Sequence, residues 1–146
     1  MTNKTPIYSN SIKLTLEGSK LLLAASERKA REIGVPMDIA VVDEGGNLLA
    51  FERMDGAKIT GIDIAINKAF TSACSRRGTH EYAEVASPGK PAFGIHVSNQ
   101  GRFVIFGGGL PIVINGKVVG GIGCSSGTAE QDRVVSQAGL DAIATE

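Results

Sequence analysis

Apolar residues recur along this chain at two different spacings, and each spacing predicts a type of element. Between Thr15 and Gly34 they recur every three or four positions, so they fall on one face of a helix. Thr15 is a residue type that caps helix N-termini, and Gly34 is a typical C-terminal stop. The helices predicted in this way cover residues 16–33, 61–75, 79–85 (a short one) and 130–144.

The remaining apolar runs are short and rich in Val, Ile and Leu, which predicts strands. The first run is apolar on both faces except for Asp38, so we expect it near the centre of a sheet. Asn115 and Gly116 separate the last two runs and form the strongest short hairpin signal. Two prolines predict a loop over 87–91, whereas the pattern over 92–103 is ambiguous. The strands are expected at residues 37–42, 48–53, 103–106, 111–114 and 117–124.

The order of these elements predicts the fold class. The strands follow one another in two groups joined by hairpins, and they do not alternate singly with helices as in parallel α/β folds. We therefore predict an α+β fold in which a five-stranded antiparallel sheet is flanked by helices. With 146 residues, the chain is expected to form a single domain over 1–146.

Composition narrows the classes of function. Hydrophobic residues make up 42% of the chain and charged residues 21%, as in globular proteins. Fifteen Lys and Arg balance fifteen Asp and Glu, so no basic surface favours nucleic acid or an anionic membrane. No apolar run is long enough to span a bilayer, and the N-terminus lacks the apolar core of a signal peptide. We expect a cytoplasmic protein with neither a nucleic-acid nor a membrane partner.

The stretch from Phe106 to Gln131 contains eight of the 19 glycines, with Val, Ile and Leu between them. Glycine within strands marks a close approach of backbone or ligand. Gly107, Gly108 and Gly109 open the stretch, and we expect the surface there to hold a flat or bulky ligand or another subunit. On a short chain of zero net charge, this surface favours a homo-oligomer.

Part of the same stretch has the glycine pattern of a dinucleotide-binding loop, at Gly121, Gly123 and Gly127. Its strand belongs to a hairpin, and too few residues follow for a second parallel strand. Glu130 and Asp132 in the first turn of the next helix would also repel phosphate. We therefore do not predict a nucleotide site.

His80 and Glu84 are the candidate metal ligands. They are four positions apart, so a helix over 79–85 places them on one face. Two such groups are half of a metal site, and a solvated helix start accounts for the same residues. His80 is also the best candidate for an axial ligand, and His96, in the ambiguous segment, is the other.

Lys68, Arg53 and Asp55 form the second candidate polar site. Lys68 lies among apolar residues in the predicted helix 61–75, and Arg53 follows a strand. A lysine at the edge of an apolar stripe normally extends to water. It equally well reaches a carboxylate, such as that of Asp55, Asp43 or a ligand. In the second case, the three residues would serve an enzyme that acts on a small oxygenated metabolite.

Three ordered motifs resemble those of the GlcG/HbpS-like family, which also supplies the C-terminal domain of PduO-type cobalamin adenosyltransferases. In addition, RRGTHEY (76–82) is similar to the free-standing members found near glycerol and diol dehydratase genes. Together the similarity covers nearly the whole chain. The three motifs are VVDEGGNLLAFERMDGA (41–57), NKAFTSA (67–73) and GGGLPIVINGKVVGGIGCSSGTAEQD (107–132).

The resemblance implies a profilin-like fold, with a five-stranded antiparallel sheet flanked by helices, and assembly into dimers or larger oligomers. It also implies a small-molecule ligand, since several members bind haem. Haem-binding relatives use a histidine of the first helix, and residues 16–33 contain none. Iron would therefore be bound by His80 or His96. No ATP or cobalamin chemistry is implied, because the matching part is not the adenosyltransferase domain.

Three hypotheses remain open. The first is an oligomeric protein that binds haem or another tetrapyrrole in diol, glycerol or glycolate catabolism, a setting implied by the resemblance alone. The second is an enzyme that uses Lys68, Arg53 and Asp55. The third is a structural module whose glycine-rich surface joins subunits.

Overall fold

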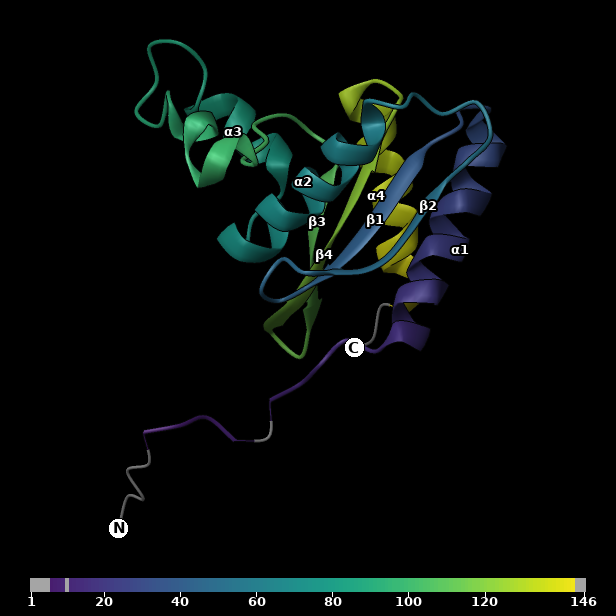
Figure 1. The fold of residues 1–146 in the computed structure, drawn as a ribbon, viewed down its shortest axis with the longest axis horizontal. Helices are drawn as coiled ribbons and strands as arrows, with labels where there is room; N and C mark the ends of the chain where they lie inside the picture. The colour runs from purple at the N-terminus through teal and green to yellow at the C-terminus, as the bar shows by residue number, and fades with distance from the viewer. Residues whose placement is uncertain (1–5, 10, 144–146) are drawn as a thin grey trace.

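A computed structural model describes residues 6–9 and 11–143 of the chain. Its centre is an antiparallel sheet with helices on both faces (Figure 1). The strands lie in the order β2-β1-β4-β3, so the N-terminal and C-terminal hairpins meet where β1 pairs with β4. The strands are β1 (Asp38–Asp43), β2 (Leu48–Arg53), β3 (Gly109–Ile114) and β4 (Lys117–Ser125).

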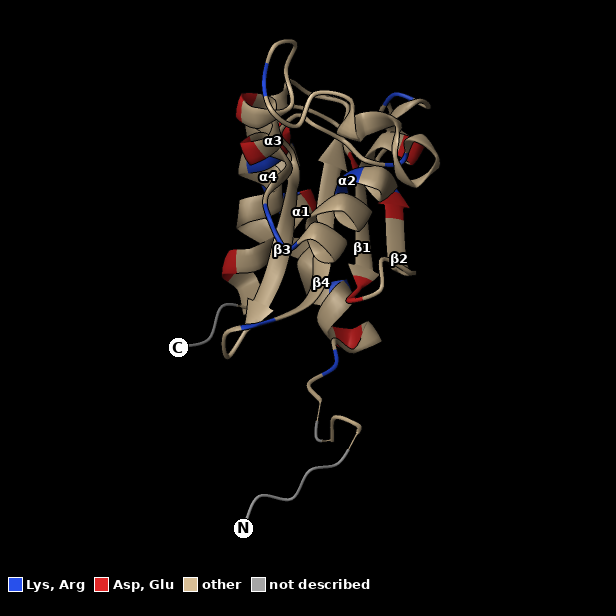
Figure 2. Ribbon diagram, turned by 90° about the vertical axis from the view of Figure 1, so that its left-hand side faces the viewer, with Lys and Arg blue, Asp and Glu red and all other residues tan. Residues whose placement is uncertain are grey.

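The helices form a layer on each side of the sheet. The first and last helices pack together on one face, and α2 covers the other, as Figure 2 shows. The helices are α1 (Leu16–Ile33), α2 (Gly61–Ser75), α3 (Thr79–Val85) and α4 (Ala129–Ile143), with single 3₁₀ turns at Ile95–Val97 and Asn99–Gly101. The predicted helices and the α+β class are confirmed; residue 144, the predicted end of the last helix, lies outside the described residues.

The prediction of five strands is wrong, because the sheet has four strands among the described residues. The segment 103–106, predicted as a strand, passes beside α2 without joining the sheet. Its Val104 N–H donates to Thr71 Oγ1 of α2 at 3.0 Å. The Phe103 ring packs edge-on against Tyr82 of α3, with ring centroids 4.8 Å apart. Phe103 and Ile105 of this segment therefore pack into a separate small core under α3.

Alternation along β1 explains the two main cores. Ile39 and Val41 face α1 and α4, whereas Ala40 and Val42 face α2. Both faces are buried, and β1 lies between β2 and β4. The predicted central position of this strand is thus confirmed.

Glycines of β4 let α2 lie directly on the sheet. A Cβ added at Gly121 would lie 2.3 Å from the Ala69 carbonyl oxygen, and one at Gly123 would lie 2.1 Å from that of Ala65. Both distances are shorter than any van der Waals contact, so only glycine fits. This close packing holds the middle of α2, including Lys68, against the end of β4.

The predicted turn at Asn115 and Gly116 is also confirmed. Asn115 and Gly116 both have positive φ, 50° and 76°, as a tight hairpin turn between β3 and β4 requires. At the start of α4, Thr128 Oγ1 accepts the Gln131 N–H and Gln131 Oε1 accepts the Thr128 N–H. This reciprocal capping box fixes where α4 begins. None of the described helices is long and apolar enough to cross a membrane.

Candidate functional site

Lys68 is a fully buried lysine whose charge is balanced within the fold. Its Nζ donates to Asp132 Oδ2 at 2.8 Å and to the Cys124 carbonyl at 3.0 Å. The two side chains of the ion pair are 1% and 3% exposed. Lys68 therefore does not extend to water, and its carboxylate partner is neither Asp43 nor Asp55. Because α2 lies directly on β4, the side chain points along the sheet toward the start of α4.

Asp132 is the partner that sequence reasoning missed. Its Oδ1 accepts the Gly127 N–H at 2.9 Å, so both carboxylate oxygens are engaged. Burial raises the pKa of Asp132, and the charge and hydrogen bond of Lys68 act against this rise. In the sequence, Asp132 stood out only as an acidic residue in the first turn of a helix, which the helix dipole alone explains.

The residues Phe106–Gly109, called here the glycine loop, lie between α3 and the Lys68–Asp132 pair. A Cβ at Gly108 would lie 2.6 Å from Lys68 Nζ, and Gly108 has φ of 129°. A Cβ at Gly109 would lie 2.4 Å from the Lys68 carbonyl oxygen. Close packing against Lys68 therefore explains why residues 108 and 109 are glycines. A Cβ at Gly107 would lie 3.4 Å from the Cβ of His80, so the glycine loop packs against α3 at this position.

A cavity of about 210 Å³ opens beside the ion pair. The Phe106 ring, which is 46% exposed, lies at its edge, with its centroid 5.0 Å from Lys68 Nζ. The start of α2, the end of β4 and the start of α4 form its walls. Its lining residues are Lys58, Thr60, Gly61, Ile64, Lys68, Phe106, Ser125, Ser126, Gly127, Ala129 and Asp132.

Asp38 lies behind the wall of this cavity and is fully buried. Its Oδ2 is 2.0 Å from the point where a Cβ of Gly61 would be, and Ser125 Oγ is 3.4 Å from the same point. Neither carboxylate oxygen has a hydrogen-bond partner in the described part of the chain. Burial raises the pKa of Asp38, Arg53 lowers it, and the negative charge of Asp132 raises it further. A single polar residue in an apolar strand was the sequence signal for this group.

His80 lies in the first turn of α3 and is half-buried. Its Nδ1 is buried against Gly78 and has no hydrogen-bond partner among residues 6–9 and 11–143. Burial lowers the pKa of His80, the nearby Arg133 lowers it further, and Glu81 and Glu84 act in the opposite direction. The neutral imidazole is therefore favoured. The structure brings His80 next to Gly107, as a shared cofactor site requires.

The other predicted site residues lie apart from one another. His96 is in the 3₁₀ turn after α3, with its ring 5.7 Å from that of Phe93. Arg53 and Asp55 are exposed near the end of β2, and Asp55 lines a separate cavity. No hydrogen bond or ion pair links either to Lys68 within the described ranges. Glu84 is exposed, and the residues described include no group of three or more potential metal ligands.

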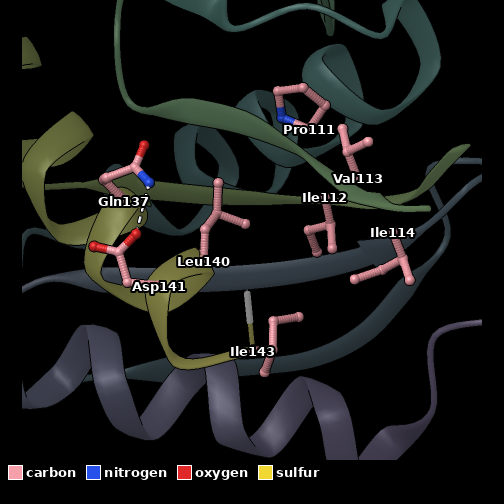
Figure 3. A pocket seen from close by; sticks show the side chains of 8 residues that line it. All are labelled: Pro111, Ile112, Val113, Ile114, Gln137, Leu140, Asp141 and Ile143. Carbon is pink, nitrogen blue, oxygen red and sulfur yellow. Dashed lines mark hydrogen bonds between the residues drawn. The ribbon is translucent and has the colours of Figure 1, made fainter. Parts of the chain in front are cut away.

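A second cavity, of about 230 Å³, lies between β3 and α4 (Figure 3). Aliphatic side chains form most of it. Its polar side chains are Gln137 and Asp141, which bond to each other at 2.9 Å. Because it is mostly aliphatic and its two polar side chains bond to each other, it is a weaker candidate for specific chemistry than the cavity at Lys68.

The family of the chain follows from a family model described as "Haem degrading protein HbpS-like", which matches residues 14–141. The chain belongs to the HbpS-like family. The family predicted from the motifs is thereby confirmed. Among curated HbpS-like relatives, an uncharacterized 15.0 kDa protein from the dhaT-dhaS intergenic region of Citrobacter freundii is 50% identical, over 88% of this chain and 90% of that protein. Protein GlcG of Escherichia coli K12 is 33% identical over 77% and 81% of the two chains.

Solved structures of HbpS-like proteins have the same fold. Protein ORFY of Klebsiella pneumoniae superimposes with a TM-score of 0.89 at 41% identity, over 97% of this chain and 96% of that one. A structure described as a PduOC:heme complex gives a TM-score of 0.87 at 32% identity, over 90% and 96% of the two chains.

Proposed function

We propose that this HbpS-like chain binds haem or a related tetrapyrrole at the glycine loop, with His80 as the axial ligand of the iron. The observation that carries the proposal is the position of His80, an imidazole with a lowered pKa, beside Gly107 of the glycine loop. A neutral ring nitrogen is the form that binds iron. The description of the family and the haem complex of a relative support the same ligand class.

The residues around His80 fit such a ligand in two further respects. Phe106 offers an exposed aromatic ring, and Arg133, which is exposed on α4 and lowers the pKa of His80, offers a guanidinium for a ligand carboxylate. The neighbouring cavity of about 210 Å³ is below the roughly 300–1,000 Å³ of sites that enclose drug-sized ligands. The tetrapyrrole would therefore be held at an open surface. Bound haem iron would supply redox chemistry there.

Assembly and setting are part of the proposal. We infer that the protein is a homo-oligomer whose copies cover the open side of this surface, and that it acts in the cytoplasm. An accessory role in diol, glycerol or glycolate catabolism rests on the family resemblance. The name of the 50% identical relative, which refers to the dhaT-dhaS intergenic region, is consistent with a gene-cluster role of this kind.

Titration with ferric haem tests the ligand and the axial residue together. The wild-type protein is expected to sharpen and shift the Soret band, as imidazole ligation does. His80→Ala should abolish the shift, and added free imidazole should restore it. His96→Ala is the matched control and should bind as the wild type does. An unchanged free-haem spectrum with the wild type contradicts haem binding, and a loss confined to His96→Ala contradicts the assignment of His80.

An enzyme acting on a small oxygenated metabolite is a second candidate. The buried Lys68–Asp132 pair at the wall of a cavity favours it, because perturbed ionisable groups in clefts mark functional sites. In this hypothesis Lys68 acts with Asp132, whereas the exposed Arg53 and Asp55 do not line the cavity. Turnover of such metabolites by the wild type but not by Ala129→Leu, which fills the cavity, would support it.

A further inference from the structure

The groups that line the cavity at Lys68 are mainly hydrogen-bond donors without acceptors. Lys68 uses two of its three N–H groups within the fold, and no residue that the structure describes accepts the third. The first N–H of α4, at Ala129, likewise has no acceptor there. The hydroxyls of Ser125 and Thr60 are also unpaired in the described chain, although Ser125 is only 5% exposed.

Asp132, the one acceptor-only side chain among the lining residues, is already engaged. Both oxygens of Asp132 accept hydrogen bonds, from Lys68 and from the Gly127 N–H. The Ser126 hydroxyl accepts the Lys58 N–H at 2.9 Å. The free N–H groups of Lys68 and Ala129 therefore favour a molecule that brings acceptors of its own.

The local charge favours an anion of low charge. The Lys58 ammonium is exposed, lines the cavity, and is close enough to lower the pKa of Asp132. The pair of Lys68 and Asp132 is neutral as a whole. Asp38 lies behind Gly61, outside the lining of the cavity, and burial raises the pKa of its carboxyl. Glu130 at the start of α4 works against a dianion such as phosphate.

We propose that this cavity is a carboxylate-binding site, in which Ser125, Lys58 and the start of α4 hold the carboxylate beside Lys68. The carboxylate has two chemical sources: a free organic acid of a few carbon atoms, or an acidic side group of a tetrapyrrole held at His80. Only the second source rests on the proposed function. The glycine loop separates the two sites, since its Gly107 faces His80 and its Gly108 faces Lys68.

Calorimetric titration with acetate, glycolate and pyruvate, each paired with its uncharged amide, tests the site on the full chain. At equal ionic strength the acids should bind and the amides should bind at least tenfold more weakly. Inorganic phosphate should also bind more weakly than the acids. Acids that bind no better than their amides, or phosphate that binds more tightly, overturn the proposal for a free acid.

Three substitutions locate the site without breaking the buried ion pair. Ser125→Ala should weaken acid binding about tenfold, as expected for one hydrogen bond to a charged group. Lys58→Met should weaken it about threefold, because its charge is exposed. Ala129→Leu should abolish binding by filling the cavity. Lys90→Met and Ala24→Leu, both at exposed positions away from the cavity, are the matched controls. If Ser125→Ala, Lys58→Met and Ala129→Leu all bind the acids as tightly as the wild type does, the acids do not bind in this cavity.

Comparing haem with haem dimethyl ester identifies the source of the carboxylate. If a tetrapyrrole side group occupies the cavity, the ester binds more weakly than haem, and Lys58→Met removes that difference. If a free acid is the ligand, haem and its ester bind alike, and His80→Ala leaves acid binding unchanged. A failed haem titration with intact acid binding refutes only the proposed function. The carboxylate site is refuted if the acids bind no better than their amides and haem binds no better than its dimethyl ester.

Discussion

Lys68 and Asp132 form an ion pair that shapes both the stability of the molecule and its candidate site. Two buried charges are costly to separate but not costly to replace together by apolar groups. The salt bridges at the surface differ from this pair because water screens them; in the Lys29–Glu32 pair, for example, the side chains are 32% and 68% exposed. The consequences of a single substitution should therefore depend strongly on which pair is broken.

Asp132→Asn is expected to lower the free energy of unfolding by about 3–5 kcal/mol, because it leaves the Lys68 charge buried without a counter-ion. The double variant Lys68→Met/Asp132→Leu should recover most of this loss. Urea denaturation measures both. Glu32→Gln, which breaks an exposed pair, is the control and should change the free energy by less than about 1 kcal/mol. Equal losses in Asp132→Asn and Glu32→Gln would contradict this account.

Residue-scale chemistry was only partly predictable from the sequence. His80, Lys68 and the glycines of the loop stood out by type and spacing, and the structure places them around one loop. The partner of Lys68 could not be found, because Asp132 is 64 positions away and has a sufficient local explanation as a helix-start acid. Arg53 and Asp55 are near Lys68 in sequence, but chain proximity does not bring them to it.

At the scale of elements, glycines of β4 bring its backbone directly against that of α2. Gly123→Ala should destabilise the protein by about 2–4 kcal/mol, because the added methyl group would overlap the α2 backbone. Thermal and urea unfolding measure the loss. Gly45→Ala, in the exposed β1–β2 turn where φ is not positive, is the matched control and should cost about 1 kcal/mol or less. A tolerated Gly123→Ala would mean that α2 moves away from the sheet readily.

The contact of α1 with β2 makes stability depend on pH. The carboxyl groups of Glu27 and Glu52 are hydrogen-bonded to each other. Burial, and to a smaller extent the hydrogen bond and charge of Glu27, raise the pKa of Glu52 to about 7. In the unfolded chain this pKa is about 4.3. The folded chain therefore retains a proton that the unfolded chain loses, and this contribution to stability falls as pH rises from about 4.5 to 7.

Glu52→Gln should remove this dependence. Between pH 5 and 7.5 its free energy of unfolding should fall by about 1 kcal/mol less than that of the wild type, a modest figure because both carboxyls are partly exposed. Urea denaturation at the two pH values gives the comparison. Glu32→Gln should keep the wild-type slope. A slope unchanged in Glu52→Gln would assign the pH dependence to other groups, such as Asp38 or Asp132.

Elements with local signals were predictable, and those fixed by distant partners were not. The helix caps and the Asn115–Gly116 turn depend on residues adjacent in the chain, so spacing alone identified them. The segment 103–106 has the composition of a strand. Its neighbours, however, are Thr71 and Tyr82 from α2 and α3, which only the folded chain brings there.

At the scale of the whole molecule, assembly into a homo-oligomer and a single domain over 1–146 stay predictions. Two edge strands, β2 and β3, are open to pairing in the isolated chain, and Leu48 and Val113 on them are 51% and 53% exposed. Light scattering at micromolar concentration should give a mass that is a multiple of 15.2 kDa. A mass of only 15.2 kDa would contradict assembly.

The position of β1 between β2 and β4 also determines when the chain is able to fold during its synthesis. Asp38 pairs with Arg53, which leaves the ribosome soon after it, and with Ser125, which leaves much later. Until then Ile39 and Val41 lack the neighbours that bury them, and such non-local pairing is slow to form and exposed to aggregation. A nascent chain that stops before β4 lacks the strand that pairs with β1 in the middle of the sheet. Its Lys68 also lacks Asp132, the carboxylate that balances its charge in the folded protein.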